Sequence, residues 1–215
     1  ANLKTNRTST IVPVIPPLLN CALEITLLEQ EEIPLHLIWS KVYTQLHIAF
    51  VEQADEEGKI SYGVSFPKYR LIQQKKLGYL GDKIRIFADS VEALEQLNLT
   101  HWFARLQDYV HVLSARKVPE DKINGYAAYF KVNPKLTVEQ RVVHQAERRG
   151  ISIEEAQEHF KALDLTETFE PYINMKSQTN DMSFRLIIGK RRVDEANIGK
   201  FGSYGLSRTS TVPEF

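Results

Sequence analysis

The sequence has little that would support a disulfide, a membrane anchor or a metal site. Cys21 is the only cysteine among 215 residues, which excludes an intramolecular disulfide and suits a reducing compartment. No apolar run approaches the roughly 20 residues of a membrane-spanning helix. The six histidines have no metal-ligand spacing, and no glycine-rich phosphate loop is present. These absences favour a cytoplasmic protein without a membrane segment, a metal ion or another cofactor.

The beginning of the chain also lacks a secretory signal. Pro13, Pro16 and Pro17 interrupt the apolar stretch there, so residues 1–20 are predicted to form an extended arm. The formal net charge is zero, which argues against a polyanion-binding surface that covers the whole protein. Charge is nevertheless segregated, because six bases and only one acid lie between Lys68 and Arg85. The sequence therefore predicts local basic patches on a neutral protein.

The first half of the chain alternates between strand and helix patterns. In order, we expect a strand at 21–27, a helix at 34–53, strands at 60–66 and around 84–86, a helix from 89 with a second segment to 106, and a strand at 109–115. Asp89 and Glu92 form a potential capping box for the second helix. This β-α-β-β-α-β order is typical of the ferredoxin-like unit. A basic loop at 68–76 separates the second and third strands.

The second half reads as a smaller α+β unit. We expect a linker at 119–125, a strand at 126–132, a helix at 137–149 with Thr137 and Gln140 as its cap, and an acidic helix to 163 that begins with a Ser152–Glu155 capping box. A last strand alternates Phe184, Leu186 and Ile188 with Ser183, Arg185 and Ile187. The helix at 137–149 is amphipathic. One of its faces carries Arg141, His144, Gln145 and Arg148, and another carries Val138, Val142 and Ala146.

Most residues that could carry chemistry also have an ordinary structural interpretation. His47 has an unperturbed pKa of about 6.5, which suits proton transfer, yet a single helical histidine is usually a surface or core-edge residue. Ser177 and Thr179 are typical turn formers, and Phe184 and Tyr204 are typical strand aromatics. The basic helix face is compatible with phosphate contacts or with plain solvation. From these patterns alone, the sequence predicts an α+β protein with basic patches.

Several segments together resemble one protein family. They are LIWSKVYTQLHIAFVEQ, YGVSFP, LGDKIRIFA, KSQTNDMSFRLII and SYGLSRTSTVP. In this order they resemble the CRISPR-associated repeat-RNA processing endoribonuclease of subtype I-F systems, the Csy-type enzyme, over residues 21–215. The resemblance implies a ferredoxin-like domain at 21–117 and an RNA-recognition domain at 118–215 with a basic helix. It also implies metal-independent cleavage of precursor CRISPR RNA 3′ of the repeat stem-loop.

The resemblance assigns roles to individual residues. His47 matches the catalytic histidine, Ser177 the serine that holds the ribose, and Tyr204 the tyrosine that orients the histidine. Thr179 occupies a second hydroxyl position, and Phe184 matches an aromatic that stacks on the end of the stem. The remaining predicted RNA contacts are Lys131, Lys135, Arg141, His144, Gln145, Arg148, Arg149, Lys176 and Arg185. The implied partners are the repeat stem-loop and the other subunits of the subtype I-F surveillance complex.

The sequence departs from the family where the family reads bases. Ala127 and Tyr129 stand where family members have a base-reading Arg and Gln, and the arginines of the helix are fewer. Either the repeat differs, or other residues read it, such as the loop from Lys68 to Lys76. Two other functions remain open: a non-catalytic scaffold subunit that binds the hairpin, and an unrelated ferredoxin-like enzyme that acts on a small molecule.

Overall fold

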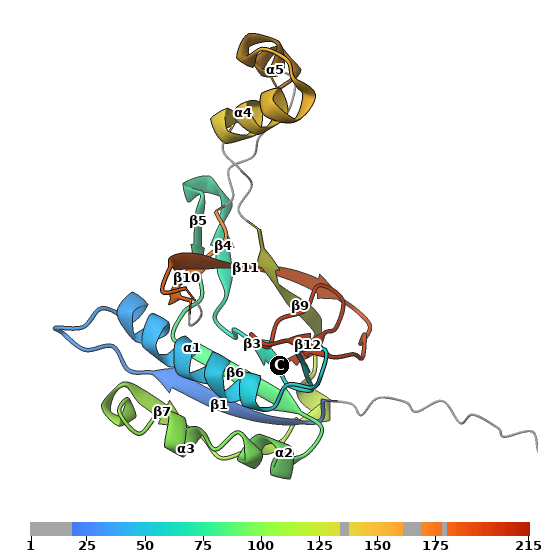
Figure 1. The fold of residues 1–215 in the computed structure, drawn as a ribbon. Helices are drawn as coiled ribbons and strands as arrows, with labels where there is room; N and C mark the ends of the chain where they lie inside the picture. Colours follow the sequence, from blue (N-terminus) through green and yellow to red (C-terminus); the bar gives the residue numbers. More distant parts are fainter. Residues whose placement is uncertain (1–18, 134–137, 161–168, 178–179) are drawn as a thin grey trace, which may run out of the picture.

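The computed structural model describes residues 19–133, 138–160, 169–177 and 180–215, and it shows an α+β protein built on antiparallel sheets (Figure 1). The larger sheet has the strand order β3-β6-β1-β7, and β8 pairs with the start of β1. Its strands are β1 (Cys21–Leu27), β3 (Gly63–Ser65), β6 (Lys83–Ala88), β7 (Val110–Val112) and β8 (Arg116–Lys117). In β1 and β6 the cross-strand pair of Ile25 and Ile84 is completely buried, which fixes the register by the apolar pattern.

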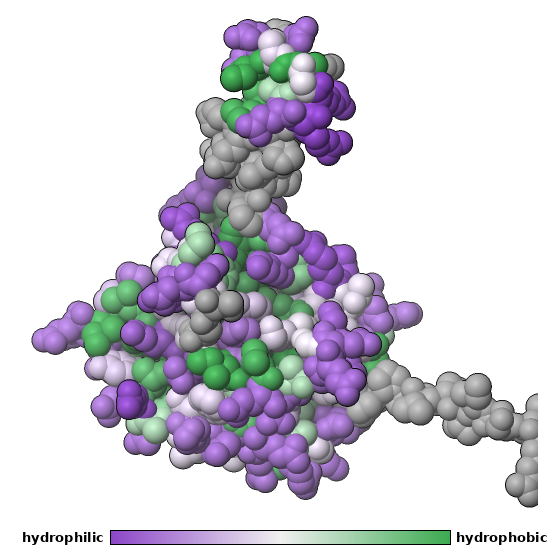
Figure 2. All heavy atoms as spheres, in the orientation of Figure 1, coloured by the Kyte–Doolittle hydropathy of each residue, from purple (hydrophilic) through white to green (hydrophobic). Residues whose placement is uncertain are grey.

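Three helices connect the strands of this sheet: α1 (Leu35–Glu52), α2 (Val91–Gln96) and α3 (Leu99–Trp102). Helix α1 begins after Pro34, whose missing N–H costs nothing at a helix start. Its stripe of Ile38, Val42, Leu46 and Phe50 is buried, as the helical periodicity predicts. Figure 2 shows hydrophilic side chains over most of one face of the molecule, with hydrophobic patches between them, and α1 contributes the exposed Leu37 and Val51 to the surface.

A second antiparallel sheet comes from the later part of the chain and has the order β10-β11-β9-β13. Its strands are β9 (Gly125–Val132), β10 (Tyr172–Lys176), β11 (Ser183–Val193) and β13 (Val212–Glu214). The edge strand β10 lies against α1, where the Ser40 hydroxyl donates a 2.6 Å hydrogen bond to the Asn174 carbonyl. Leu186 and Ile188 of β11 are buried in the core, in agreement with the predicted alternation.

Two small sheets and several short helical turns complete the main body. Strand β2 (Lys59–Ile60) pairs with β12 (Phe201–Gly202), and β4 (Arg70–Ile72) forms a hairpin with β5 (Leu77–Tyr79) across the 3-10 turn η1 (Gln73–Lys75). The turns η2 (Gln107–Tyr109) and η3 (Glu120–Lys122) flank β7 and β8. The segment 68–76, predicted as a loop, therefore contains most of a β-hairpin.

One hydrophobic core joins the two halves of the chain. Buried residues of the first sheet and α1, such as Tyr43 and Phe66, belong to the same cluster as Tyr129, Ile173 and Leu186 of the second sheet. Tyr129 packs edge-on against Phe66 with ring centroids 5.4 Å apart. The two sheets therefore depend on each other for burial.

Helices α4 (Val138–Arg149) and α5 (Ile153–Phe160) form a separate small core of Val142, Ala146 and Ala156. Figure 1 draws this pair apart from the sheets. The predicted capping box of α5 is confirmed, because the Ser152 hydroxyl accepts from the Glu155 N–H at 3.1 Å and the Glu155 carboxylate accepts from the Ser152 N–H at 3.2 Å. The predicted cap of α4 at Thr137 lies outside the described residues, as does the end of the acidic helix beyond Phe160.

Four further local predictions were wrong. Ser90, and not Asp89, is the N-cap of α2, and its hydroxyl accepts from the Ala93 N–H at 3.2 Å. The predicted strand at 60–66 is split into β2 and β3, which pair with different partners. The helix expected to continue to Leu106 ends at Trp102. The last strand, expected at 109–115, comprises only Val110–Val112, and a second short strand follows it.

Candidate active site

The candidate site is centred on His47, which lies on α1 beside the buried Leu46. The side chain is half-buried, and its Nδ1 lies 2.8 Å from the carbonyl oxygen of Ser203. A carbonyl can only accept, so Nδ1 carries the proton in this hydrogen bond. In the neutral ring Nε2 is then the unprotonated nitrogen, which can accept a proton.

The pKa of His47 favours this neutral form. Burial of the ring lowers the pKa of His47 below its ordinary value, and the hydrogen bond to the Ser203 carbonyl opposes that shift only in part. At neutral pH, His47 therefore presents a basic Nε2 in a fixed tautomer. This is the protonation state that a general base requires.

Tyr204 holds the plane of the imidazole. The two rings stack with centroids 4.0 Å apart and planes inclined by 9°. Burial raises the pKa of the Tyr204 phenol, so the tyrosine stays neutral at physiological pH. Together, the stacked ring and the Ser203 carbonyl define both the position and the rotation of His47.

The backbone turn that carries Ser203 and Tyr204 is anchored on several sides. Gly205 N–H donates to the Gly202 carbonyl at 2.8 Å, and Val64 N–H donates to the Gly205 carbonyl at 2.9 Å. Gly205 has a φ of +71°, and a Cβ at this position would lie 2.3 Å from Cγ2 of Val64. Only glycine fits both the conformation and the space.

Tyr43 fixes the same turn from the side of the helix. It is fully buried one turn before His47 on α1, and its hydroxyl donates a 2.8 Å hydrogen bond to the Tyr204 carbonyl. Burial raises the pKa of Tyr43, which keeps the phenol protonated and able to donate. No sequence pattern assigned a role to Tyr43, to the Ser203 carbonyl or to Gly205. The S-Y-G stretch around Tyr204 is the sequence signal that indicates this turn.

Ser177 opens the turn between β10 and β11. Its N–H donates to the Met182 carbonyl at 2.8 Å, and its carbonyl accepts from the Asp181 N–H at 3.2 Å. A cavity of about 740 Å³ lies between α1 and this hairpin, and its lining includes Thr44 and Lys176. Thr44 is one helical turn before His47 and Lys176 directly precedes Ser177, so both candidate residues lie next to lining residues of one cavity. The predicted second hydroxyl, Thr179, lies outside the described residues.

Phe184 lies at the start of β11 and is partly buried. The ammonium group of Lys131 on β9 lies 5.6 Å from the centroid of its ring. The side chain of Lys131 is exposed, and its carbonyl accepts a 3.0 Å hydrogen bond from Arg208. A cation and a partly open aromatic ring therefore lie together, a combination that suits the stacking of a base.

The other predicted RNA contacts have different surroundings. Lys176 forms an exposed ion pair with Asp181 at 2.9 Å, and the Arg185 guanidinium lies 4.6 Å from the ring centroid of Tyr172. On α4, Gln145 is partly buried, whereas Arg148 and Arg149 are exposed. Two further residues, Arg141 and His144, belong to α4, but their side chains are outside the described part of the structure, as is the whole of Lys135.

The two positions that depart from the family pattern face the core. Ala127 and Tyr129 are both buried, and the Tyr129 hydroxyl donates to the Glu214 carboxylate at 3.1 Å. These side chains cannot reach a nucleic acid from their buried positions. Any contact to a base would have to come from other residues.

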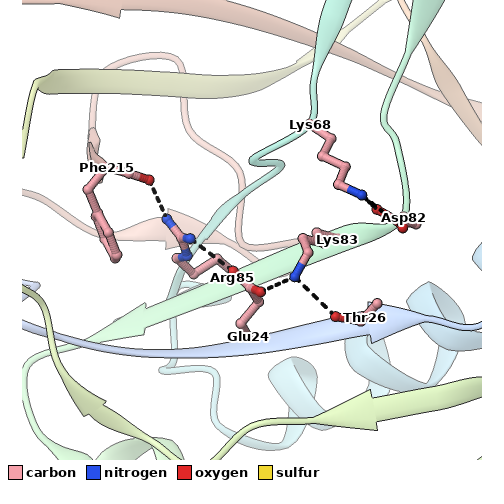
Figure 3. A network of polar contacts seen from close by, with 7 residues as sticks. All are labelled: Glu24, Thr26, Lys68, Asp82, Lys83, Arg85 and Phe215. Carbon is pink, nitrogen blue, oxygen red and sulfur yellow. Dashed lines mark hydrogen bonds and ion pairs between the residues drawn. The ribbon is translucent and has the colours of Figure 1, made fainter.

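Part of the basic segment at 68–85 is neutralised within the protein (Figure 3). Lys68 pairs with Asp82 at 2.7 Å, and Lys83 and Arg85 both pair with Glu24 of β1. Burial raises the pKa of Glu24, but the hydrogen bonds from Lys83 and Arg85 outweigh it and lower the pKa below its ordinary value. The bases at 68, 83 and 85 thus serve the fold more than a ligand.

Within the described part of the chain, no cluster of three or more His, Cys, Asp or Glu is arranged to hold a metal ion. None of the described helices is both long and apolar enough to span a membrane.

A family model for CRISPR-associated proteins, Cas_Csy4, matches residues 23–215, so the chain belongs to this family. Among individual proteins, the chain is 29% identical over 195 residues to the CRISPR-associated endonuclease Cas6/Csy4 of Escherichia coli (strain UTI89 / UPEC). It is 30% identical over 200 residues to the CRISPR-associated endonuclease Cas6/Csy4 of Pseudomonas aeruginosa (strain UCBPP-PA14). Each match covers 90% of this chain and 98% of the relative. The family that the sequence motifs resemble is thus confirmed.

Proposed function

We propose that this protein is an endoribonuclease that cleaves precursor CRISPR RNA 3′ of the repeat stem-loop and needs no metal ion. The observation that carries this proposal is the state of His47, a neutral imidazole whose Nδ1–H is held by the Ser203 carbonyl and whose ring is stacked on Tyr204. Membership of the Cas_Csy4 family and the names of both relatives as CRISPR-associated endonucleases support the RNA substrate.

In the proposed reaction, the 2′-hydroxyl of the nucleotide before the cut attacks its own 3′ phosphate. The O2′–P bond forms while the bond from phosphorus to the 5′ oxygen of the next nucleotide breaks. Nε2 of His47 accepts the proton of the 2′-hydroxyl and later returns it to solvent, and the departing 5′ oxygen takes a proton from water. The products are a 2′,3′-cyclic phosphate and a 5′-hydroxyl.

The protein contributes mainly alignment and a base of suitable pKa. Ser177 would hold the ribose from the hairpin turn while His47 approaches from α1, so that the nucleophile and the leaving oxygen lie in line with phosphorus. Such positioning is worth up to about 7–11 kcal/mol of the barrier in well-oriented reactions. General base catalysis adds typically about 10²–10⁴-fold in rate.

The wider assignment rests on the same proposal. A ferredoxin-like domain at 21–117 fits the strand order β3-β6-β1-β7, and a C-terminal RNA-recognition domain at 118–215 would present α4 to the stem. Phe184 would stack on the end of the stem, with Lys131, Arg148 and Arg149 near its phosphates. We further propose a cytoplasmic protein that stays on the hairpin as a subunit of the surveillance complex.

The test is single-turnover cleavage of a labelled repeat stem-loop from the adjacent CRISPR array. Wild type should cut, His47→Ala should bind without cutting, and His111→Ala, which removes an exposed histidine of β7, should behave as wild type. A single 2′-deoxy substitution before the cut should abolish cleavage and preserve binding, and a chelator should change nothing. If wild type and His47→Ala bind the RNA and are equally inert, the protein is a scaffold subunit instead. Absence of any affinity for the stem-loop would favour the small-molecule enzyme.

A further inference from the structure

The solvent-facing side of the β10–β11 hairpin carries a row of polar and aromatic side chains that the proposed reaction does not use. On β10, the alternating residues Tyr172, Asn174 and Lys176 are exposed, while Ile173 and Met175 enter the core. The register pairs Asn174 with Arg185 of β11, so these two side chains share the outer face. Tyr172 is 46% exposed, which is high for a strand tyrosine, and Arg185 lies against its ring.

Two cavities meet along this row. The cavity of about 740 Å³ beside the candidate site shares Asn174 and Arg185 with a second one of about 780 Å³. The second cavity extends over Tyr172 to the β4–β5 hairpin, where its lining includes Lys76 and Tyr79, and it is also lined by His36 of α1. The two cavities form one groove that starts beside Phe184 and Lys176 and ends at Tyr79. We call it the hairpin groove.

The chemistry of the hairpin groove suits single-stranded nucleic acid. Its lining supplies cations and two exposed tyrosines, and Glu170 is the only acid among the described residues that line it. Each tyrosine has an arginine on its ring, since Arg70 lies 5.0 Å from the ring centroid of Tyr79. Aromatic rings that alternate with cations are the common way to bind single strands, because any base can stack on them.

The position of the hairpin groove indicates which single-stranded part of the RNA it would bind. Phe184 and Arg185 are neighbours on opposite faces of β11, and both line the cavity nearest the candidate site. A strand that leaves the end of the stem at Phe184 and passes Ser177 can therefore cross the edge strand β10 to its outer face. The β-strand β10 spans about 13 Å from Lys176 to Tyr172. This length accommodates about four RNA nucleotides at the stacked rise of 3.4 Å.

We propose that the hairpin groove binds the single-stranded RNA on the 3′ side of the cut, with Tyr172 as its main stacking residue. This inference rests on the proposed function and adds a second binding subsite to it. The groove would hold the leaving strand in line with the attacking 2′-hydroxyl and would increase affinity for the uncut precursor. After cleavage the short 3′ fragment would dissociate, because it is held by this groove alone.

The experiment measures binding of three uncleavable repeat stem-loops, each with a 2′-deoxy nucleotide before the cut. One ends just 3′ of the stem, one carries an added single-stranded 3′ tail, and one carries a 5′ tail of the same length and composition. In wild type, the 3′ tail should increase affinity about fivefold or more, as expected for one stacked base. Tyr172→Ala should remove this gain without changing affinity for the tail-less RNA.

Two variants control for other effects of the substitution. Tyr172→Phe keeps a stacking ring and should retain the gain. Tyr126→Ala removes a partly exposed tyrosine of β9 that lines a different cavity, and it should also retain the gain. The inference is overturned if the 3′ tail adds nothing in wild type, if the 5′ tail gives the same gain, or if Tyr172→Ala keeps it. Failure of wild type to bind even the tail-less stem-loop would refute the proposed function itself.

Discussion

Gly205 offers the sharpest test of how the candidate site is built, because a single methyl group there should disturb the turn that positions His47. The residue has a φ of +71°, and a left-handed conformation costs an L-residue with a side chain about 1–2 kcal/mol. The added Cβ would also lie 2.3 Å from Val64 Cγ2 and 3.1 Å from Phe50 Cε2. Ordinary contacts begin at 3.4 Å, so the turn or Val64 must move by roughly 1 Å.

The chain contains a matched control for this substitution. Gly58 has nearly the same φ, +70°, but nothing lies within 4 Å of the position that a Cβ would take there. Gly58→Ala should therefore cost only the conformational part, about 1–2 kcal/mol of the free energy of unfolding. Gly205→Ala should cost about 2–5 kcal/mol, because overpacking adds about 1–3 kcal/mol. Urea unfolding of the three proteins measures the difference.

Catalysis should separate the two variants further. Gly205→Ala moves the Ser203 carbonyl and the Tyr204 ring, and a misplacement of about 1 Å can cost about 10²-fold in rate. Gly58→Ala should cleave at the wild-type rate in single-turnover assays below its unfolding transition. Adding Val64→Ala to Gly205→Ala should recover part of both losses, with a coupling energy of about 0.5–3 kcal/mol. Equal stability and equal cleavage of the two glycine variants would show that the turn is not packed as described.

Three further predictions concern the same site and its support. The single-turnover cleavage rate should be flat at neutral pH and should fall on the acid side with a midpoint below pH 6.5. The reason is that burial lowers the pKa of His47 and only the neutral ring accepts a proton. A midpoint above pH 6.5 would contradict this prediction. Tyr204→Phe should keep most of the cleavage activity, since the ring stack is retained. Tyr204→Leu should lose the stacking contribution, which raises the activation free energy of cleavage by about 0.5–1.5 kcal/mol. Equal cleavage rates of the two variants would exclude a role for the ring. Glu24→Gln should lower the free energy of unfolding at pH 7 by about 1.5–3 kcal/mol. The pKa of Glu24 is lowered in the folded state, so the stability that Glu24 contributes is present above its ordinary pKa and is lost as the pH falls through the folded-state pKa. If Glu24→Gln lowers the free energy of unfolding by the same amount in acid, the ion pairs with Lys83 and Arg85 are refuted.

Local patterns in the sequence were sufficient where the structure depends on local interactions. The Ser152–Glu155 capping box could be predicted because both hydrogen bonds join residues three apart. The α2 cap was displaced by one residue because Asp89 and Ser90 can both cap a helix, and the sequence does not distinguish them. The buried alternation at 60–66 was recognised, but its division between two sheets depends on β12, which lies far away in the sequence.

The candidate site shows the same limit more strongly. Family motifs led to His47 and Tyr204, but no pattern within the chain predicted that their rings would stack. The sequence indicates only a core aromatic at Tyr43, whereas in the structure its hydroxyl donates a hydrogen bond to the Tyr204 carbonyl. The family resemblance places Tyr129 at a base-reading position, whereas the shared core of the two sheets buries it. Each of these relations joins segments that only tertiary packing brings together.

The small core of α4 and α5 has a consequence for engineering this protein. Val142, Ala146 and Ala156 bury one another in a cluster that, among the described residues, is separate from the core that supports His47. A relative's helical pair could accordingly be transplanted as a cassette between residues 133 and 169. If the proposed function holds, we expect such a chimera to exchange its RNA preference and to keep the cleavage chemistry of the recipient.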